Sequence, residues 1–392
     1  MQTDLNNSIS NLATELQTWR RHLHMHPEPS FQEWQTMEFV ATVLEKYGIS
    51  FEKGVADTGV VAMIRASWHA PEAPCLALRA DLDALPIQEL NEVTYKSQNE
   101  GWMHACGHDV HTTILLGTAV MLQQQKEQLK RPIKLIFQPG EEQSPGGATL
   151  MIKAGVLENP AVEELVALHV YPEMEVGNVG LRSGLYMASS DEIHVEIEGI
   201  GGHGALPARF INPIDVGMAW IQACKTTVAD KCPSNIPQVL TFGRFEALGS
   251  TNVVASTAQI KGTFRTMDES WRAKVHAILQ AQADQVATEF GAKIHLKIAK
   301  GYPFLHNDPA LTDQVRGILI QTLGPNHVHE LDLRMTAEDF AFYSQERPVC
   351  FFRLGVGNTE KGIVHAVHHP RFDIDEQALE IGVKCLLQIA LS

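Results

Sequence analysis

The sequence predicts an α/β protein, because short apolar runs alternate with amphipathic segments over most of its 392 residues. Apolar residues at helical spacing predict helices at 5–24, 36–47 and 112–124. Short apolar runs predict buried strands at 75–80, 133–138 and 165–169. Strands that alternate with helices in this way form a mostly parallel central sheet covered by helices.

A different pattern begins near residue 182. Apolar and polar residues alternate at 193–198 and 259–265, and helical patterns follow Pro213 and Asp268. Strict alternation is typical of strands with one buried and one exposed face. This block therefore predicts a separate α+β domain with a half-exposed sheet.

The helix–strand alternation returns after Tyr302, with helices expected at 308–323 and 376–391 and a strand at 349–354. The first part of the chain therefore continues beyond the α+β block. We expect two domains, a discontinuous main domain of residues 1–182 and 300–392 and an inserted domain of residues 183–299.

Composition excludes several classes of protein. The formal net charge of −15 argues against nucleic acid or an anionic membrane as a partner. No apolar stretch approaches the roughly 18 residues of a membrane span. Asp4, Glu15, Arg20 and Arg21 interrupt the first thirty residues, so no signal peptide is expected. The six scattered cysteines suggest no disulfide framework, which favours a reducing, cytoplasmic setting.

The segment from His104 to His111 contains three histidines, one cysteine and one aspartate. Cys106 and His108 suit a loop that enters a helix, a change of direction that Gly107 allows. A single cysteine or histidine in such a segment would more often be an ordinary buried residue at a polar helix start. Cysteine sulfur and histidine nitrogen are preferred zinc ligands, and their density here favours a metal site.

Acidic and imidazole groups also follow the other predicted strands. Glu141 and Glu142 come directly after the strand at 133–138, where one could bind metal while the other acts as a base. Alone, this pair would be a solvated acidic turn. Three further groups are weak individually, and each has an ordinary structural explanation: Asp81 with Asp83, His169, and His365 with His368 and His369.

Together these motifs resemble the aminoacylase–carboxypeptidase metallohydrolases. The resemblance is closest to the amidohydrolase group that contains hippurate hydrolase, N-acyl-amino-acid deacylases and plant auxin-conjugate hydrolases. It covers essentially the whole chain. The matching motifs are, in order, residues 23–28, 79–86, 104–109, 138–142, 201–204, 262–265 and 368–370.

The resemblance implies two divalent metal ions per subunit, zinc or manganese, with cobalt or nickel as alternatives. It implies five ligands: Cys106, His108, Glu142, His169 and His368. Glu141 falls on the family's general base. Many relatives have a histidine ligand where this chain has Asp81, so we expect Asp81 and Asp83, like Asp109, to support the ligands rather than to bind metal.

The inserted domain resembles the family's lid and dimerisation domain. The resemblance implies that His203 reaches the active site of a neighbouring subunit in a homodimer and acts there in catalysis. It also implies that Asn252 and Arg265 bind the carboxylate of the substrate. Ala208 and Asn212 stand where relatives often have a histidine and an aspartate, so the lid hinge is expected to differ.

We therefore expect a metal-dependent amidohydrolase that cleaves N-acyl amino acids, such as acetyl or benzoyl derivatives, into an acid and a free amino acid. A dipeptidase or carboxypeptidase on the same scaffold is the main alternative. Two other functions remain open at this point, a non-catalytic metal-binding protein and a hydrolase in which Cys106 is the nucleophile. A metal-binding protein would not need Glu141 beside a ligand glutamate or a closing lid, and a cysteine hydrolase would leave the acids and the additional histidines without a role.

Overall fold

A computed structural model describes residues 2–392, with side chains from Ser8 onward. The chain divides into two compact units. Unit 1 comprises the residues up to Gly184, His306–Asp332 and Phe342–Ser392, and unit 2 comprises Leu185–Leu305 and Leu333–Ala341. No sequence pattern indicated that the short segment Leu333–Ala341 belongs to unit 2.

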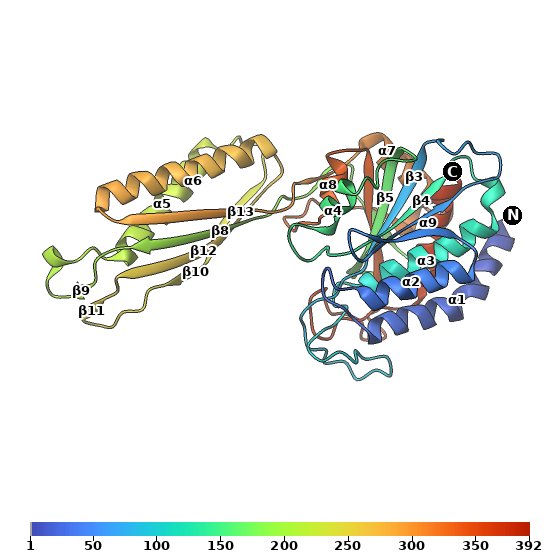
Figure 1. The fold of residues 1–392 in the computed structure, drawn as a ribbon, viewed down its shortest axis with the longest axis horizontal. Helices are drawn as coiled ribbons and strands as arrows, with labels where there is room; N and C mark the ends of the chain where they lie inside the picture. Colours follow the sequence, from blue (N-terminus) through green and yellow to red (C-terminus); the bar gives the residue numbers. More distant parts are fainter. Residues whose placement is uncertain (1) are drawn as a thin grey trace. The chain divides into compact units, whose positions relative to one another are not determined.

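Unit 1 is built on an eight-stranded sheet with the order β1-β2-β4-β3-β5-β16-β6-β15 (Figure 1). Its central neighbours β4, β3, β5 and β16 are parallel, whereas β1 pairs with β2, β2 with β4, and β6 with β16 in antiparallel fashion. The strands are β1 (Ser50–Val55), β2 (Gly59–Ile64), β3 (Cys75–Asp81), β4 (Ile133–Gln138), β5 (Val162–Glu175), β6 (Val179–Leu181), β15 (Val328–Glu330) and β16 (Val349–Gly357).

Helices cover this sheet. α3 and α9 pack on the strands and on each other, and α1 packs on both helices (Figure 1). The helices are α1 (Gln2–Met25), α2 (Trp34–Lys46), α3 (His108–Gln124), α4 (Gly147–Lys153), α7 (Pro309–Leu323), α8 (Ala341–Ser344) and α9 (Gln377–Leu391), with short 3₁₀ turns at η1 (Lys126–Gln128) and η3 (Pro325–His327). The prediction of an α/β fold with a helix-covered central sheet is confirmed.

Unit 2 has an antiparallel sheet with the order β10-β12-β8-β13, and α5 and α6 pack on it (Figure 1). Its main elements are β8 (Asp191–Glu198), α5 (Pro213–Lys231), β10 (Gln238–Glu246), β12 (Thr257–Thr266), α6 (Glu269–Phe290) and β13 (Lys293–Lys300). A small two-stranded antiparallel sheet contains β9 (Gly202–His203) and β11 (Val253–Val254), and the turn η2 (Pro207–Arg209) follows β9. Two further strands, β7 (Gly184–Met187) and β14 (Leu305–Asn307), span the unit boundaries in the sequence.

The sequence explains why the elements of unit 2 begin where they do. Ile193, Val195 and Ile197 are buried, and the residues between them are not, as the alternating pattern predicts. Asn212 and Asp268 cap α5 and α6, because their side chains accept backbone N–H groups of Ile214 and Trp271. The predicted helices after Pro213 and Asp268 are confirmed.

The parallel strands of unit 1 place the candidate site. In β3 and β4, Asp81 pairs with Gln138, so the carboxyl ends of these strands lie at the same edge of the sheet. α3 begins at His108, four residues before the helical pattern expected from 112. The difference arises because three of the four added residues, His108, Asp109 and His111, are buried polar groups, which carry no apolar periodicity. No helix in the described part of the chain is long and apolar enough to cross a membrane.

Candidate metal centre

Gly107 makes the sharp entry from a loop into α3 that brings Cys106 and His108 together. Its φ is +81°, in the left-handed region that glycine adopts readily. A Cβ at this position would lie 2.6 Å from a methyl carbon of Val170, so the backbone also approaches β5 closely. Any larger residue at 107 would clash with Val170 and strain the backbone that carries Cys106 and His108.

Cys106 belongs to two groups of potential ligands. One group contains Cys106, His108 and His169, and the other contains Cys106, Glu142 and His368, with all ligand atoms of a group within 4.8 Å of one another. Cys106 Sγ lies 3.4 Å from His169 Nε2, and His368 Nε2 lies 3.3 Å from Glu142 Oε1. Tetrahedral zinc, with bonds of about 2.0–2.3 Å, requires ligand atoms roughly 3.5 Å apart. The donor atoms therefore fit metal coordination.

In two of the histidines the Nδ1 atom is engaged by the protein, which leaves the Nε2 atom available to bind metal. Asp83 Oδ1 lies 3.1 Å from His108 Nδ1, and the carbonyl oxygen of Val170 accepts from His169 Nδ1 over 2.8 Å. Such partners fix the ring and the tautomer of a metal ligand. Among the described residues, the buried atoms His108 Nε2 and Glu142 Oε1 have no hydrogen-bond partner and lie 4.0 Å apart. A cation between them would satisfy both.

His111 also lies in this cluster but has no free nitrogen. Its Nδ1 is 2.6 Å from Asp81 Oδ1, and its Nε2 accepts the backbone N–H of Val170 over 2.9 Å. Asp81 in turn forms an ion pair with Arg79. Although Asp81, His108 and His111 lie close enough to bind an ion, these bonds give Asp81 and His111 a supporting position.

The charge balance of the cluster favours cations. Burial, and then Glu142, Glu141 and Asp81, raise the pKa of the Cys106 thiol well above its usual value. Burial lowers the pKa of His108, but Asp81, Asp83 and Glu142 outweigh it and raise that pKa to about 10. The cluster therefore has an excess of negative groups, and divalent ions would stabilise both the thiolate and the carboxylates.

The two adjacent histidines near the C-terminus differ in their surroundings. His369 Nδ1 accepts the backbone N–H of Arg371, and its ring stacks on that of His365 with centroids 4.2 Å apart. His368 instead faces Glu142 and has a φ of +66°, a conformation that non-glycine residues rarely adopt. Backbone strain of this kind tends to persist at functional sites.

The two glutamates of the β4 loop are both near the cluster. Glu142 belongs to the group with Cys106 and His368, and both glutamates form a further group with His108. Glu141 is buried, with a 7% exposed fraction. Both carboxylates therefore lie within reach of an ion bound at His108.

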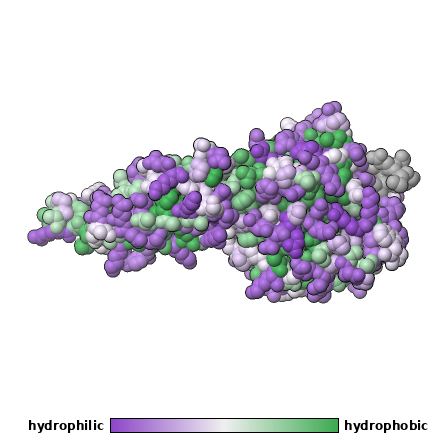
Figure 2. Space-filling view, turned by 90° about the horizontal axis from the view of Figure 1, so that it is seen from above, coloured by the Kyte–Doolittle hydropathy of each residue, from purple (hydrophilic) through white to green (hydrophobic). Residues whose placement is uncertain are grey.

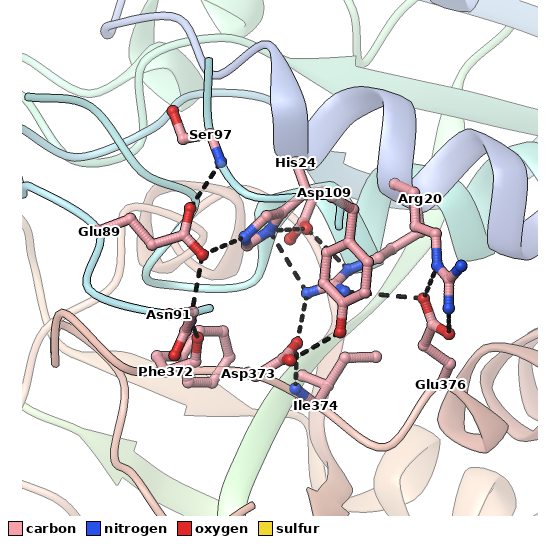
Figure 3. A network of polar contacts seen from close by, with 12 residues as sticks. Arg20, His24, Glu89, Asn91, Ser97, Asp109, Phe372, Asp373, Ile374 and Glu376 are labelled. Atoms are coloured by element: carbon pink, nitrogen blue, oxygen red, sulfur yellow. Dashed lines mark hydrogen bonds and ion pairs between the residues drawn. The ribbon is translucent and has the colours of Figure 1, made fainter. Parts of the chain in front are cut away.

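Asp109 lies on the other side of the α3 N-terminus, in a buried polar network (Figure 3). Its Oδ2 accepts from Arg20 Nε over 3.0 Å and lies 2.7 Å from His24 Nδ1, and the other side of the His24 ring is 3.3 Å from Glu89. This network anchors the start of α3 to α1. The roles of Arg20, His24 and Glu89 in this network were not predicted from the sequence. A polar or charged residue beside the apolar face of α1 is a signal that could have found Arg20 and His24, whereas Glu89 lies in a loop and carries no such signal.

The site residues predicted in the inserted domain lie at two places in unit 2. Gly204, next to His203, donates its N–H to the carbonyl oxygen of Asn252, so the structure brings these exposed residues together at the β9–β11 sheet. Arg265 is near the opposite end of β12, where it pairs with Val239. At about 3.3 Å per residue, the eight steps from Thr257 to Arg265 span roughly 26 Å. The structure does not bring Asn252 and Arg265 together within one chain.

Comparison with known proteins gives the family. Residues 77–392 match the family model of Peptidase family M20/M25/M40. The chain is a member of this family. N-acetyl-L-cysteine deacetylase of Bacillus subtilis is 38% identical to it over 379 residues, which cover 95% of this M20 chain and 86% of the relative.

Other relatives carry related names. IAA-amino acid hydrolase ILR1-like 4 of Arabidopsis thaliana is 37% identical over 93% of this chain and 82% of its own length, and thermostable carboxypeptidase 2 of Saccharolobus solfataricus is 34% identical over 97% and 96%. The crystal structure of Bacillus subtilis YXEP protein, described as a dinuclear metal binding peptidase, superposes with a TM-score of 0.82 at 31% identity, covering 97% of this chain and 98% of that one. The predicted family and the predicted class, a metal-dependent hydrolase of amide bonds, are confirmed.

Proposed function

We propose that this M20 hydrolase cleaves the amide bond of N-acyl amino acids, at a centre of two divalent ions that share Cys106. The observation that carries the proposal is the membership of Cys106 in two separate donor groups, one with His108 and His169 and one with Glu142 and His368. Relatives named for deacetylation of N-acetyl-L-cysteine and for hydrolysis of IAA-amino acids support this substrate class. We propose zinc or manganese, with cobalt or nickel as alternatives, and the thiolate favours zinc.

Glu141 is the general base in this proposal. When bound, the ions would supply Lewis acidity that lowers the pKa of water and polarises the substrate carbonyl. Glu141 takes a proton from the attacking water and later delivers it to the leaving nitrogen. Asp83 holds the His108 ring, and Asp81 holds His111 beside β5, so the chain keeps its donor atoms in place before substrate arrives.

Arg265 is the proposed receptor for the substrate carboxylate. It is half-buried, and burial lowers its pKa. Within the part of the chain whose side chains are described, residues 8–392, no hydrogen bond or ion pair occupies its guanidinium group. A guanidinium without a protein partner is suited to bind a carboxylate through two parallel hydrogen bonds.

We further propose a homodimer in which His203 and Asn252 serve the partner's active site. Their distance from Arg265 along the sheet supports this, because a single chain cannot place all three on one small substrate. Unit 2 also exposes large apolar residues near the β9–β11 sheet and on α5, and hydrophobic residues are visible between hydrophilic ones on its surface (Figure 2). These residues are Ile200, Leu206, Ile214, Met218, Leu248 and Val253.

Carboxypeptidase activity is the second candidate, because two thermostable carboxypeptidases are each 34% identical to this chain. The two candidates differ in the group that precedes the scissile bond. A panel of N-acetyl, N-benzoyl and longer N-acyl amino acids, together with dipeptides and blocked peptides, separates them when it is run with each of the four metals. We expect cleavage of the N-acyl amino acids and loss of activity after chelation. Cleavage of peptides alone would favour the carboxypeptidase.

The cysteines support a reducing compartment as the place of action, which we propose to be the cytoplasm. All six are free, and five of them are buried. Disulfides form and persist in oxidising compartments.

A further inference from the structure

A short connection between α1 and α2, residues 28–36, is tied to two of the loops that carry the site. The Glu28 carboxylate caps α2 by accepting the N–H groups of Gln35 and Thr36, over 3.1 and 2.8 Å, and the Thr36 hydroxyl over 2.9 Å. The Glu28 carbonyl accepts the N–H of Ala84 over 2.8 Å. The connection is therefore fixed both to its own helix and to the loop after β3.

Ser30 extends this attachment to the ligands. Its hydroxyl donates to Asp83 Oδ2 over 2.6 Å, and the same oxygen accepts the backbone N–H of Glu142 over 2.9 Å. The other oxygen of Asp83 faces His108. One carboxylate thus joins the connection to two proposed ligands.

Glu33 reaches the loop that contains the proposed base. Its side chain is fully buried, and Oε1 accepts the backbone N–H of Gly140 over 2.8 Å while Oε2 accepts the Thr58 hydroxyl over 2.5 Å. Gly140 has a φ of +61°, and a Cβ there would lie 2.2 Å from the ring of Phe31. The backbone just before Glu141 is therefore held from two sides by the connection.

An acid is a costly choice for this position. Both hydrogen-bond partners of the Glu33 side chain are neutral. Burial and the charge of Asp83 raise the pKa of Glu33 to about 7. A buried carboxyl without a cation destabilises a fold, whereas either protonation state still offers an oxygen to the Gly140 N–H. The contact with the Gly140 N–H, next to Glu141, is therefore kept in both protonation states of Glu33.

We infer that Glu33 is a positioning residue for catalysis: by holding the N–H of Gly140, it fixes the backbone from which the Glu141 carboxylate extends toward the attacking water. This inference rests on the proposed function, in which Glu141 is the base. A base must lie within hydrogen-bond reach of the proton it removes, and a displacement of about 1 Å can lower the rate by roughly 10²-fold.

The test compares Glu33→Ala with Glu33→Gln in the full-length, metal-loaded enzyme. Glutamine keeps an oxygen for Gly140 N–H, and the Thr58 hydroxyl can turn to accept from its amide. We expect Glu33→Gln to keep kcat within about threefold of wild type and Glu33→Ala to lower kcat by roughly 10–100-fold. KM and the metal content measured by emission spectroscopy should change little in both.

A matched control separates positioning from stability. Asp308→Ala removes the cap of α7, where Asp308 accepts from Leu311, and should lower Tm without lowering kcat. If Glu33→Ala does not fold, Glu33→Asp takes its place, because it keeps the acid but shortens its reach to Gly140, and the same fall in kcat is expected.

Three results would overturn the inference: wild-type kcat in Glu33→Ala, equal losses in the alanine and glutamine variants, or a loss that follows metal content. Glu141→Gln, measured in parallel, distinguishes this failure from failure of the proposed function. An inactive Glu141→Gln beside a fully active Glu33→Ala removes only the role of Glu33. A fully active Glu141→Gln removes the proposed base and the inference with it.

Discussion

His368 donates its backbone N–H to the carbonyl oxygen of Ala105 over 2.8 Å. The bond ties a proposed ligand from the end of the chain to the residue before Cys106. The separation of the two ligands is therefore set by main-chain geometry as well as by their side chains. Because ligand atoms must be placed to within a few tenths of an ångström of the metal distances, this attachment favours a preformed centre.

Glu141 and Glu142 should give different losses when each is changed to glutamine. Glu141→Gln should retain metal and lower turnover by about 10²–10⁴-fold, because the proton acceptor is gone but the donors remain. Glu142→Gln should lose metal as well as activity. Metal content and turnover measured on the same samples decide between the roles. If the two phenotypes are exchanged, so are the assignments of base and ligand.

His203 should act across the dimer. Mixed with Glu141→Gln, the inactive His203→Ala variant should regenerate activity, because one site of each heterodimer then has both wild-type groups. Random exchange of subunits should restore about a quarter of the wild-type activity. Native mass spectrometry can verify that exchange has occurred. No recovery in verified heterodimers would place His203 in its own chain's site or outside catalysis.

Arg265 should bind the carboxylate of the substrate. Loss of a charge-assisted pair in a closed site costs about 2–5 kcal/mol, so Arg265→Ala should strongly lower kcat/KM for an N-acyl amino acid. The same change should have little effect on the matching N-acyl amino amide, which wild type should already cleave poorly. Comparing both substrates with both enzymes isolates the interaction. An equal effect on acid and amide would exclude this role.

Asp191 should contribute acid-sensitive stability to unit 2. Burial raises its pKa, but hydrogen bonds from His276 and from both sides of the Arg272 fork outweigh burial and lower the pKa to about 2. A depressed native pKa stabilises the fold above the unfolded value of about 4, and this stabilisation is lost as the pH falls toward 2. Asp191→Asn should therefore cost on the order of 2 kcal/mol at neutral pH.

The measurement for Asp191 is thermal unfolding of wild type and variant between pH 2 and 7. The difference between them should shrink below about pH 4 and nearly vanish at the acid end. A difference that stays constant over this range would show that hydrogen bonding alone, and not the charge of Asp191, stabilises the unit.

The sequence predicted those parts of the fold that have a local cause. The helix after Asp268 follows from a capping side chain and an apolar face, and β8 follows from its alternation. β1 was not predicted, because it is a polar strand at the edge of the sheet with mostly exposed residues. β1 forms a strand because it pairs with β2, and its own sequence does not indicate that pairing.

The same distinction applies to the site. The groups around Cys106 and Glu142 could be predicted because the proposed ligands lie in dense polar motifs, one at the start of α3 and one directly after β4. Glu33 could not, because a single acid in a short connection has no local signature. Its contact with Gly140 is 107 residues distant in the sequence and exists only once the sheet has formed.

The order of strands in unit 1 constrains how the protein is made. β16 lies between β5 and β6, so the sheet stays divided until residue 357 has been synthesised. Ribosomes add about 5–20 residues each second. Between the synthesis of β5 and the synthesis of β16, β5 exposes an edge that can pair with another chain. His368 follows β16 in the sequence. A nascent chain therefore exposes the edge of β5 before it has all the proposed donors for metal.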